Sequence, residues 1–291
     1  MKEREVSQFG SNPEFAISKD QKERFITRRM VVKIGSSTLS KDGDPLNRVF
    51  MDSIACQSSR LFKSGVELLI VSSGAVVSGD WLIRERGINI NQLFSGHLQS
   101  LTEKEGKVFL DRVRAFYGQA ELMSTWREAF AHYGILAGQG LYEDRNLKKE
   151  NTKDVLESCC KIGVPIINAN DAVSDFEMRQ FALSADNDKL AGFIARTVNA
   201  DTLILLTDVD GVLDKNGEVL SHVDRLEDIQ ELIKDTSGRP GGMWGKAIVA
   251  KTAARDDKRA FIASGREKDV LVRIAKGENV GTRFKKGWML Y

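Results

Sequence analysis

The chain has 291 residues, of which 42% are hydrophobic and 29% are charged, a composition typical of a soluble globular protein with ample material for a core. Its 43 basic and 41 acidic residues leave a formal net charge of +2, so the charge balance indicates no surface built to bind nucleic acid. No apolar run approaches the roughly 18 residues that a membrane crossing needs, and the polar start of the chain is unlike a secretory signal.

The start of the chain differs in character from the rest. Residues 1–27 are polar and have little hydrophobic periodicity, so we expect an N-terminal extension in front of one domain at residues 28–291. The three cysteines, Cys56, Cys159 and Cys160, lack metal-ligand spacing. Reduced thiols in a cytoplasmic protein are the plain interpretation.

From residue 29 onward, short apolar runs alternate with stretches of helical periodicity. We expect strands at 30–34, 67–71, 135–137, 164–168, 202–207 and 260–263, and a closing edge at 281–284. We expect helices at 49–63, 108–133, 151–162, 190–198, 226–233, 244–259 and 267–275, with an irregular excursion at 87–106. This alternation predicts an α/β fold with an open, mainly parallel sheet sandwiched between helices.

Ligands of such sheets bind beyond the carboxyl ends of the strands. Polar segments follow four of the predicted strands, and we expect them along a single edge: Lys33–Ser37, Ser72–Ala75, Asn168–Asp171 and Thr207–Asp210. Each also has a purely structural interpretation, as a surface lysine before a turn, a serine helix cap, an Asx-turn or an Asp-Gly turn.

The chemistry of these segments suits a phosphorylated ligand and an amino acid. Lys33, followed by Gly35, can neutralise phosphate charge where the backbone comes close to the ligand. Amide and carboxylate groups at Asn168–Asp171 can bind an ammonium and a carboxylate at once. Three further Asx residues, at 186–188, are more than one helix cap requires.

The strongest phosphate signal is the segment 238–246, which holds four glycines and ends in Lys246. Such a run is entropically costly unless the backbone needs unusual dihedral angles or must approach a ligand closely. His97, His132 and His222 are scattered, without the spacing of a zinc site or a catalytic dyad. We therefore predict no residues that ligate a metal by themselves.

Taken in order, seven segments resemble the amino acid kinase family. They are VVKIGSSTL (31–39), VSSGAV (71–76), PIINANDAV (165–173), DND (186–188), LLTDVDG (205–211), GGMWGK (241–246) and GTRF (281–284). The likeness covers residues 29 to 284. It is strongest to the branch that phosphorylates the side-chain carboxylate of L-glutamate, the first step of proline biosynthesis, and we do not expect the C-terminal PUA domain of many relatives.

The resemblance implies in-line transfer of the γ-phosphoryl group of ATP, with Mg²⁺, to a carboxylate. By matching position, Lys33 and Lys246 would be catalytic, and Ser73, Gly74, Asp171 and Asn187 would bind the amino acid. The nucleotide would be bound by Lys33, Gly35, Thr207, Asp208, Gly241, Gly242, Met243 and Lys246. The partners implied are small molecules, with neither nucleic acid nor membrane, and family members are usually homo-oligomers.

Two alternatives stay open. One is a sister kinase acting on another small carboxylate, such as an N-acetylated amino acid. The other is a non-catalytic member that binds nucleotide or amino acid for regulation, motivated by departures from the family pattern: Arg239 and Pro240 precede the glycines, Gly245 precedes Lys246, and Ala185 replaces a glycine. Pro240 in particular removes an N–H donor.

Overall fold

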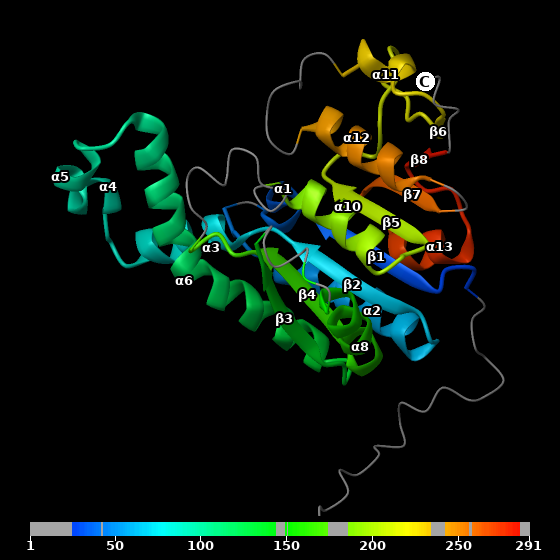
Figure 1. Cartoon of the computed structure of the whole chain (residues 1–291), viewed down its shortest axis with the longest axis horizontal. Coiled ribbons are helices and arrows are strands. Elements are labelled where there is room, and N and C mark those ends of the chain that lie inside the picture. The colour runs from blue at the N-terminus through cyan, green and yellow to red at the C-terminus, as the bar shows by residue number, and fades with distance from the viewer. Residues whose placement is uncertain are drawn as a thin grey trace, which may run out of the picture.

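The computed structural model of the chain describes residues 25–41, 43–143, 149, 151–173, 186–233, 242–255 and 258–285. Within these ranges eight strands form one sheet in the order β3-β4-β2-β1-β5-β7-β8-β6 (Figure 1). All neighbouring strands run parallel except β7 and β8. The strands are β1 Arg29–Ile34, β2 Glu67–Ser72, β3 Ala137–Tyr142, β4 Val164–Ala169, β5 Thr202–Thr207, β6 His222–Val223, β7 Arg259–Ser264 and β8 Thr282–Phe284.

Helices cover both faces of the sheet, as the alternation of elements predicted. They are α1 Ser36–Leu39, α2 Arg48–Lys63, α3 Ala75–Glu85, α4 Ile90–Leu93, α5 Ser95–Leu98, α6 Glu103–Ala131, α8 Thr152–Ile162, α10 Asn187–Thr197, α11 Glu227–Gln230, α12 Met243–Ala253 and α13 Val270–Lys276. No helix in the described ranges has the length and apolar character that a membrane crossing requires.

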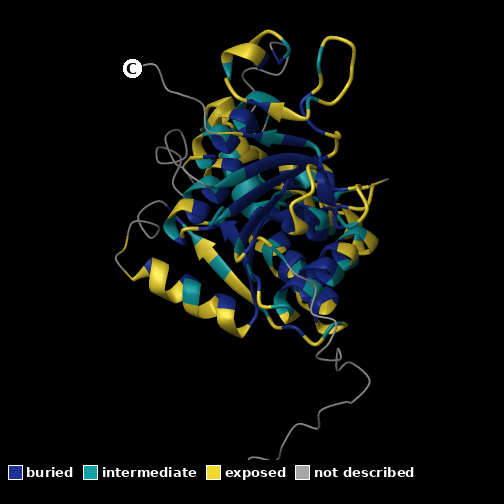
Figure 2. Cartoon of the chain, turned by 90° about the vertical axis from the view of Figure 1, so that its right-hand side faces the viewer, coloured by how far each residue is buried: buried dark blue, intermediate teal, exposed yellow. Residues whose placement is uncertain are grey.

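Two separate cores lie on the two faces of the sheet. Figure 2 shows the buried residues in dark blue at the centre of the molecule, with exposed residues in yellow around them. Met30, Val32 and Ile34 of β1 belong to the core that α2, α6 and α13 complete. Val31 belongs to the other core, which α8, α10 and α12 complete. Because side chains alternate along a strand, Lys33 follows Val31 onto the α10 and α12 face.

Helix α3 crosses α6 at very close range, and the first part of α6, near α4 and α5, extends away from the sheet (Figure 1). A Cβ atom at Gly118 would lie 1.9 Å from the carbonyl oxygen of Ala75, and one at Gly79 would lie 1.8 Å from that of Arg114. Only glycine permits this approach. A capping box between Thr102 and Glu105 begins α6.

Several boundaries differ from the sequence prediction. The excursion at 87–106 contains α4, α5 and the start of α6, because Ile83, Ile90 and Leu110 form a small apolar cluster there. The strand expected at 135–137 is instead Ala137–Tyr142, paired along its length with β4. The helix expected at 226–233 is the single turn α11.

The helix expected at 244–259 ends at Ala253, because Arg259 pairs with Thr202 as the first residue of β7. The expected closing edge at 281–284 is also wrong: β8 lies inside the sheet, and β6 forms the edge. Residues 1–24 of the expected extension lie outside the described residues. Ile26 already donates a backbone hydrogen bond to Ala275, and Thr27 is buried.

Candidate active site

Four strands end side by side with their polar segments, as the parallel topology requires. Ile34 is in register with Ser72 on β2 and with Leu206 on β5, and β2 pairs in turn with β4. The segments after β4, β2, β1 and β5 therefore lie along one edge of the sheet. This confirms the expected placement, and it brings the candidate amino acid and nucleotide residues to adjacent positions.

Two lysines from distant parts of the chain meet at one carboxylate. Nζ of Lys33 lies 2.7 Å from Oδ1 of Asp188, and Nζ of Lys246 lies 3.0 Å from Oδ2. The exposed fractions of the three residues are 4% for Lys33, 7% for Lys246 and 0% for Asp188. The two amines are thus held on opposite oxygens of one buried counter-ion.

Helix starts place this pair. The Asp186 carboxylate caps α10 by accepting a hydrogen bond of 2.9 Å from the backbone N–H of Asp188, which fixes Asp188 in the first turn. In α12, the backbone N–H of Lys246 donates to the carbonyl of Gly242 at 3.1 Å, within that helix's first turn. Both first turns face the end of β1, where Lys33 lies.

Burial makes the ammonium of Lys33 costly. It lowers the pKa of Lys33 below its ordinary value, and the positive charge of Lys246 lowers that pKa further, while Asp188 acts in the opposite direction. A group that brings additional negative charge to the two amines is therefore electrostatically favoured here.

The backbone beside Lys33 leaves room for such a group. A Cβ atom at Gly35 would lie 3.3 Å from Nζ of Lys33, so any side chain there would crowd the ammonium. Gly35 has an extended conformation that any residue could adopt. Glycine is needed at this position because a side chain would not fit beside the ammonium, and not because of its backbone conformation.

A chain of amides lies next to the lysine pair. Nδ2 of Asn187 donates to Oγ of Ser73 at 2.8 Å and to Oδ1 of Asn168 at 3.2 Å. Nδ2 of Asn168 donates to Oε1 of Gln119 on α6 at 2.9 Å. This network fixes which way each amide points. It leaves Oδ1 of Asn187 buried and without a hydrogen-bond partner among the described residues, and such an acceptor invites a donor from a ligand.

The two adjacent serines after β2 have different surroundings. Oγ of Ser72 is in the core and accepts a hydrogen bond of 2.9 Å from the Trp126 indole. Ser73 instead faces Asn187. Gly74 adopts the left-handed conformation with φ of +116° and is surrounded by leucine side chains. The geometry of Gly74 supports a backbone role at the start of α3.

Asp171 is half-buried in the turn that follows β4. The same turn is held by a hydrogen bond of 3.2 Å from Nε of Arg112 to the carbonyl of Ala172. Asn170 adds one of 3.4 Å from Nδ2 to Oε1 of Glu143. Helix α6 and the end of β3 thereby support the turn that carries Asp171.

The candidate nucleotide residues lie on the other side of Lys33. Oγ1 of buried Thr207 donates to Oδ1 of exposed Asp208 at 3.1 Å. Gly242 caps α12, and the side chain of Met243 packs against the core of the α10 and α12 face. Gly241 and residues 238–240 lie outside the described residues.

Residues 28–264 match the amino acid kinase family. The chain belongs to the amino acid kinase family. Relatives named glutamate 5-kinase include one from Methanosarcina mazei, 33% identical over 91% of this chain and 70% of its own length. Another, from Caldanaerobacter subterraneus subsp. tengcongensis, is 34% identical over 88% of this chain and 67% of its own length. The family membership makes the chain an ATP-dependent kinase with small-molecule substrates.

A solved structure supports the fold. The crystal structure of UMP kinase from Ureaplasma parvum covers 89% of this chain with a TM-score of 0.57 and 13% sequence identity. The whole of that chain is covered as well. At this identity the likeness concerns the α/β architecture alone.

The described residues contain no group of three or more His, Cys, Asp and Glu side chains arranged to hold a metal. In kinase sites Mg²⁺ is held by one or two carboxylates together with substrate phosphates. Asp188 is taken up by the two lysines, whereas Asp208 is exposed at the same edge. One exposed carboxylate, that of Asp208, fits a Mg²⁺ ion whose other ligands are the phosphates of the nucleotide that brings it.

Sequence reasoning missed one member of this site, Gln119, and the roles of two others. Asp188 was noticed as part of an Asx run, but not as the counter-ion of both lysines. Asn168 was expected to bind a ligand, but in the structure it holds Asn187 in place together with Gln119. Gln119 lies inside the long helix α6, where no local pattern distinguishes it from a surface glutamine. Only the contact with Asn168 does.

Proposed function

We propose that the protein transfers the γ-phosphoryl group of ATP to the side-chain carboxylate of L-glutamate, giving L-glutamyl 5-phosphate for proline biosynthesis. The names of the relatives at 33% and 34% identity support this acceptor. The observation that carries the chemistry is the convergence of Lys33 and Lys246 on the buried carboxylate of Asp188.

In this proposal Lys33 and Lys246 are the catalytic residues. The transferring phosphoryl group spreads negative charge over its oxygens in the transition state. Two ammonium groups in a largely buried site stabilise that charge far more strongly than they would in water. Asp188 acts as a positioning residue, because it holds both amines before the substrates arrive.

The amino acid would be held at the amide chain. Its ammonium needs acceptors, and Oδ1 of Asn187 is a buried acceptor without a partner among the described residues. Asp171 would contribute a negative charge to the same ammonium, while Ser73 and the backbone at Gly74 complete the proposed pocket. An N-acetylated amino acid has no ammonium to offer, so the arrangement favours a free amino acid.

The nucleotide would be held from the opposite side by Gly35, Thr207, Asp208, Gly242 and Met243, together with the two lysines. Mg²⁺ bound with ATP would neutralise charge on the phosphates, and Thr207 and Asp208 are the residues that would hold it. A carboxylate oxygen of glutamate forms the new bond to phosphorus as the bond to the ADP oxygen breaks. No general base is needed, because the acceptor carboxylate is already ionised at neutral pH.

The test is a coupled assay of ADP release, with Mg²⁺, over a panel of carboxylate acceptors that includes glutamate, aspartate and N-acetylglutamate. We expect release that depends on glutamate. Lys33→Ala and Lys246→Ala should each lower kcat by about 100-fold to 1,000-fold, the effect of removing one donor to developing charge. Lys153→Ala, at an exposed position of α8, is the control. Full rates in both lysine variants would refute their assignment, and turnover with N-acetylglutamate alone would refute the acceptor.

We also propose that the protein acts in the cytoplasm as a homo-oligomer. Cys56, Cys159 and Cys160 are all free thiols, as a reducing compartment allows. Analytical ultracentrifugation of the full chain would test the association, and a monomer at micromolar concentration would refute it.

A further inference from the structure

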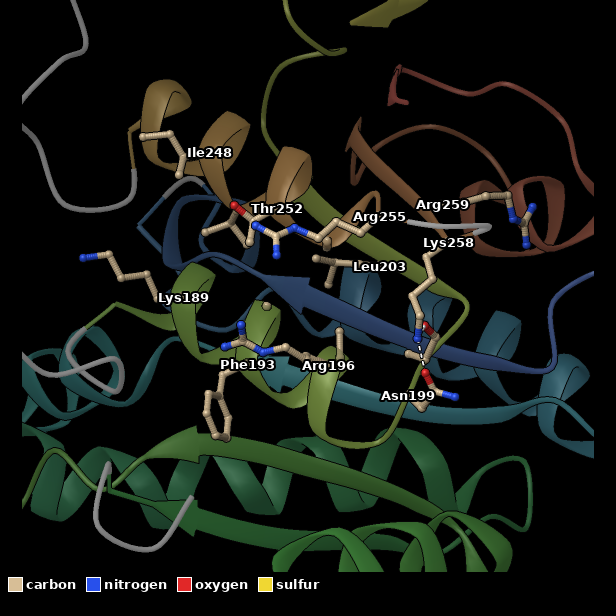
Figure 3. A pocket seen from close by; sticks show the side chains of 15 residues that line it. Lys189, Phe193, Arg196, Asn199, Leu203, Ile248, Thr252, Arg255, Lys258 and Arg259 are labelled. Atoms are coloured by element: carbon tan, nitrogen blue, oxygen red, sulfur yellow. Dashed lines mark hydrogen bonds between the residues drawn. The ribbon is translucent and has the colours of Figure 1, made fainter. Parts of the chain in front are cut away.

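A groove lies between α10 and α12 on the face of the sheet that these two helices cover, and β5 lies beneath it (Figure 3). Its volume is about 450 Å³, within the range of small-molecule sites. It begins at Lys189, directly after Asp188 in the first turn of α10, and extends to Lys258, just before the start of β7. One end therefore adjoins the candidate active site, and the rest runs along the helices toward the opposite edge of the sheet.

The groove is cationic. Five of its lining residues carry positive charge and none of the described ones is a carboxylate: Lys189, Arg196, Arg255, Lys258 and Arg259. Asp256 and Asp257, which follow Arg255 in the sequence, lie outside the described residues. Carboxylates normally intersperse with cations on a protein surface, so this local excess of one sign indicates an anionic ligand.

Two of these cations already have structural partners. The Arg259 guanidinium turns away from the groove and donates to Oγ1 of Thr27, to Oγ1 of Thr202 at 2.7 Å and to the carbonyl of Ile274 at 3.1 Å. Nζ of Lys258 donates to Oδ1 of Asn199 and to the carbonyl of Ala200 at 3.2 Å.

The other three cations, Lys189, Arg196 and Arg255, form no ion pair within the described part of the chain. The Arg196 guanidinium lies over the Phe193 ring, 5.6 Å from its centroid. Figure 3 shows Lys189 at one end of the groove, with Arg196 and Arg255 on its two banks. The arginine side chains come from different helices and present planar guanidinium forks, which match phosphate oxygens in pairs. Their separation across the groove suits a ligand that lies between the helices.

The floor between these cations is apolar. It consists of Leu203 on β5 together with Val249 and Ala253 on α12. A Cβ atom at Gly192 would lie 2.8 Å from Cγ1 of Val249, so the two helices approach closely there. Leu203 and Val249 are only 2% and 9% exposed, whereas Ala253 is half-buried, so a ligand with a planar or apolar body would cover the remaining apolar surface at Ala253 more fully than a small inorganic anion.

We propose that the groove binds a small phosphate-bearing molecule of about mononucleotide size, and that its occupation changes the kinase rate. The phosphate lies between Arg196 and Arg255, and the apolar body rests against Ala253 above the buried floor. Binding needs only the groove. The effect on rate rests on the proposed kinase function, because α10 and α12 carry Asp188 and Lys246 in their first turns. A ligand that alters the spacing of these helices alters the ion pair between them.

The probe is GMP, titrated calorimetrically against the full chain with MgADP and L-glutamate present in excess to occupy the active site. We expect saturable binding at millimolar GMP or below, weaker at high salt and tighter than binding of inorganic phosphate. The double variant Arg196→Gln/Arg255→Gln should weaken GMP binding at least about tenfold, because it removes two charged hydrogen-bond donors. Thr252→Trp, at an exposed lining position, should block the groove without removing charge.

The matched control is Lys153→Gln/Lys161→Gln, which removes two exposed positive charges from α8 and should leave GMP binding unchanged. Absence of saturable GMP binding, or equal binding in the groove variants and the control, overturns the site. Binding of GMP without a change in ADP release overturns the effect on rate. If the wild-type chain associates with itself and the groove variants do not, the occupant of the groove is a second copy of the chain and not a phosphate-bearing molecule. If no acceptor is phosphorylated, the kinase proposal fails, but the titration still decides the groove.

Discussion

Replacing Asp188 by asparagine tests the central ion pair of the site. The variant keeps the shape of the side chain but removes the negative charge that two lysines share. It leaves two ammonium groups, 4% and 7% exposed, facing one another without that counter-ion. Removing one partner of a buried ion pair typically costs about 3–5 kcal/mol.

A second estimate limits that cost. The folded variant can relieve the repulsion by releasing a proton from one lysine. With an unperturbed lysine pKa of about 10.4, this costs about 4.6 kcal/mol at pH 7 and about 1.9 kcal/mol at pH 9. The loss in free energy of unfolding should therefore be about 3–5 kcal/mol at pH 7 and no more than about 2 kcal/mol at pH 9.

The assay is urea denaturation of the wild type and Asp188→Asn at both pH values, read by circular dichroism. The matched control is Asp154→Asn, because Asp154 also lies in the first turn of a helix but is exposed. It should lose no more than about 1 kcal/mol, the usual effect of a first-turn carboxylate on the helix dipole. A loss below about 1 kcal/mol for Asp188→Asn at pH 7, or one that stays constant between pH 7 and pH 9, would refute the electrostatic account.

Three further predictions concern other residues. Burial, followed by the charge of Lys246, lowers the pKa of Lys33 below the ordinary lysine value of 10.5. Because Lys33 then loses its proton below pH 10.5, kcat/KM should fall on the alkaline side before that pH is reached. Between the lowered pKa and pH 10.5 the unfolded state binds more protons than the folded state, so the contribution of Lys33 to the free energy of unfolding should rise with pH. A flat pH-rate profile up to that pH would contradict this. Asn187→Leu should raise KM for glutamate by about 10-fold to 150-fold, the loss of one hydrogen bond to a charged group, with a much smaller change in KM for ATP; equal changes in both would point to misfolding of the edge. Gly118→Ala should destabilise the fold by about 3 kcal/mol or more in urea denaturation, because the new Cβ would meet backbone atoms of α3 at 1.9 Å and 2.3 Å. The control is Gly96→Ala, because Gly96 has open space around it. Similar stability of the two variants would contradict the close crossing of α3 and α6.

Much of the fold could be predicted from the sequence because its signals are local. The run 202–207 has four consecutive apolar residues between two threonines, and it forms β5 with those bounds, buried along its whole length. Gly65 follows the helical pattern at 49–63, and it adopts φ of +90° just after α2 ends. Since parallel strands share one carboxyl edge, placing Lys33 and Thr207 at the same edge needed only the alternation of strands and helices. That β1 and β5 are neighbours came from the structure.

Other boundaries depended on contacts between distant segments. The helical pattern at 244–259 continues past Ala253, but the chain leaves the helix so that Arg259 can pair in the sheet and reach the carbonyl of Ile274. Residues 281–284 look like a final edge, yet β6 adds beyond β8. A pairing that forms across the sheet outweighs a preference of a few tenths of a kcal/mol per residue.

The sequence by itself determined the alternating strands and helices, the shared edge and the presence of two lysines and several amides there. The tertiary structure decided which Asx residue at 186–188 does what: Asp186 caps α10, Asn187 reaches Ser73, and Asp188 pairs with both lysines. Local pattern cannot separate these three, because each is a small polar residue at a helix start. Their roles follow from how α10 packs against β1 and α12, and packing depends on residues far away in the chain.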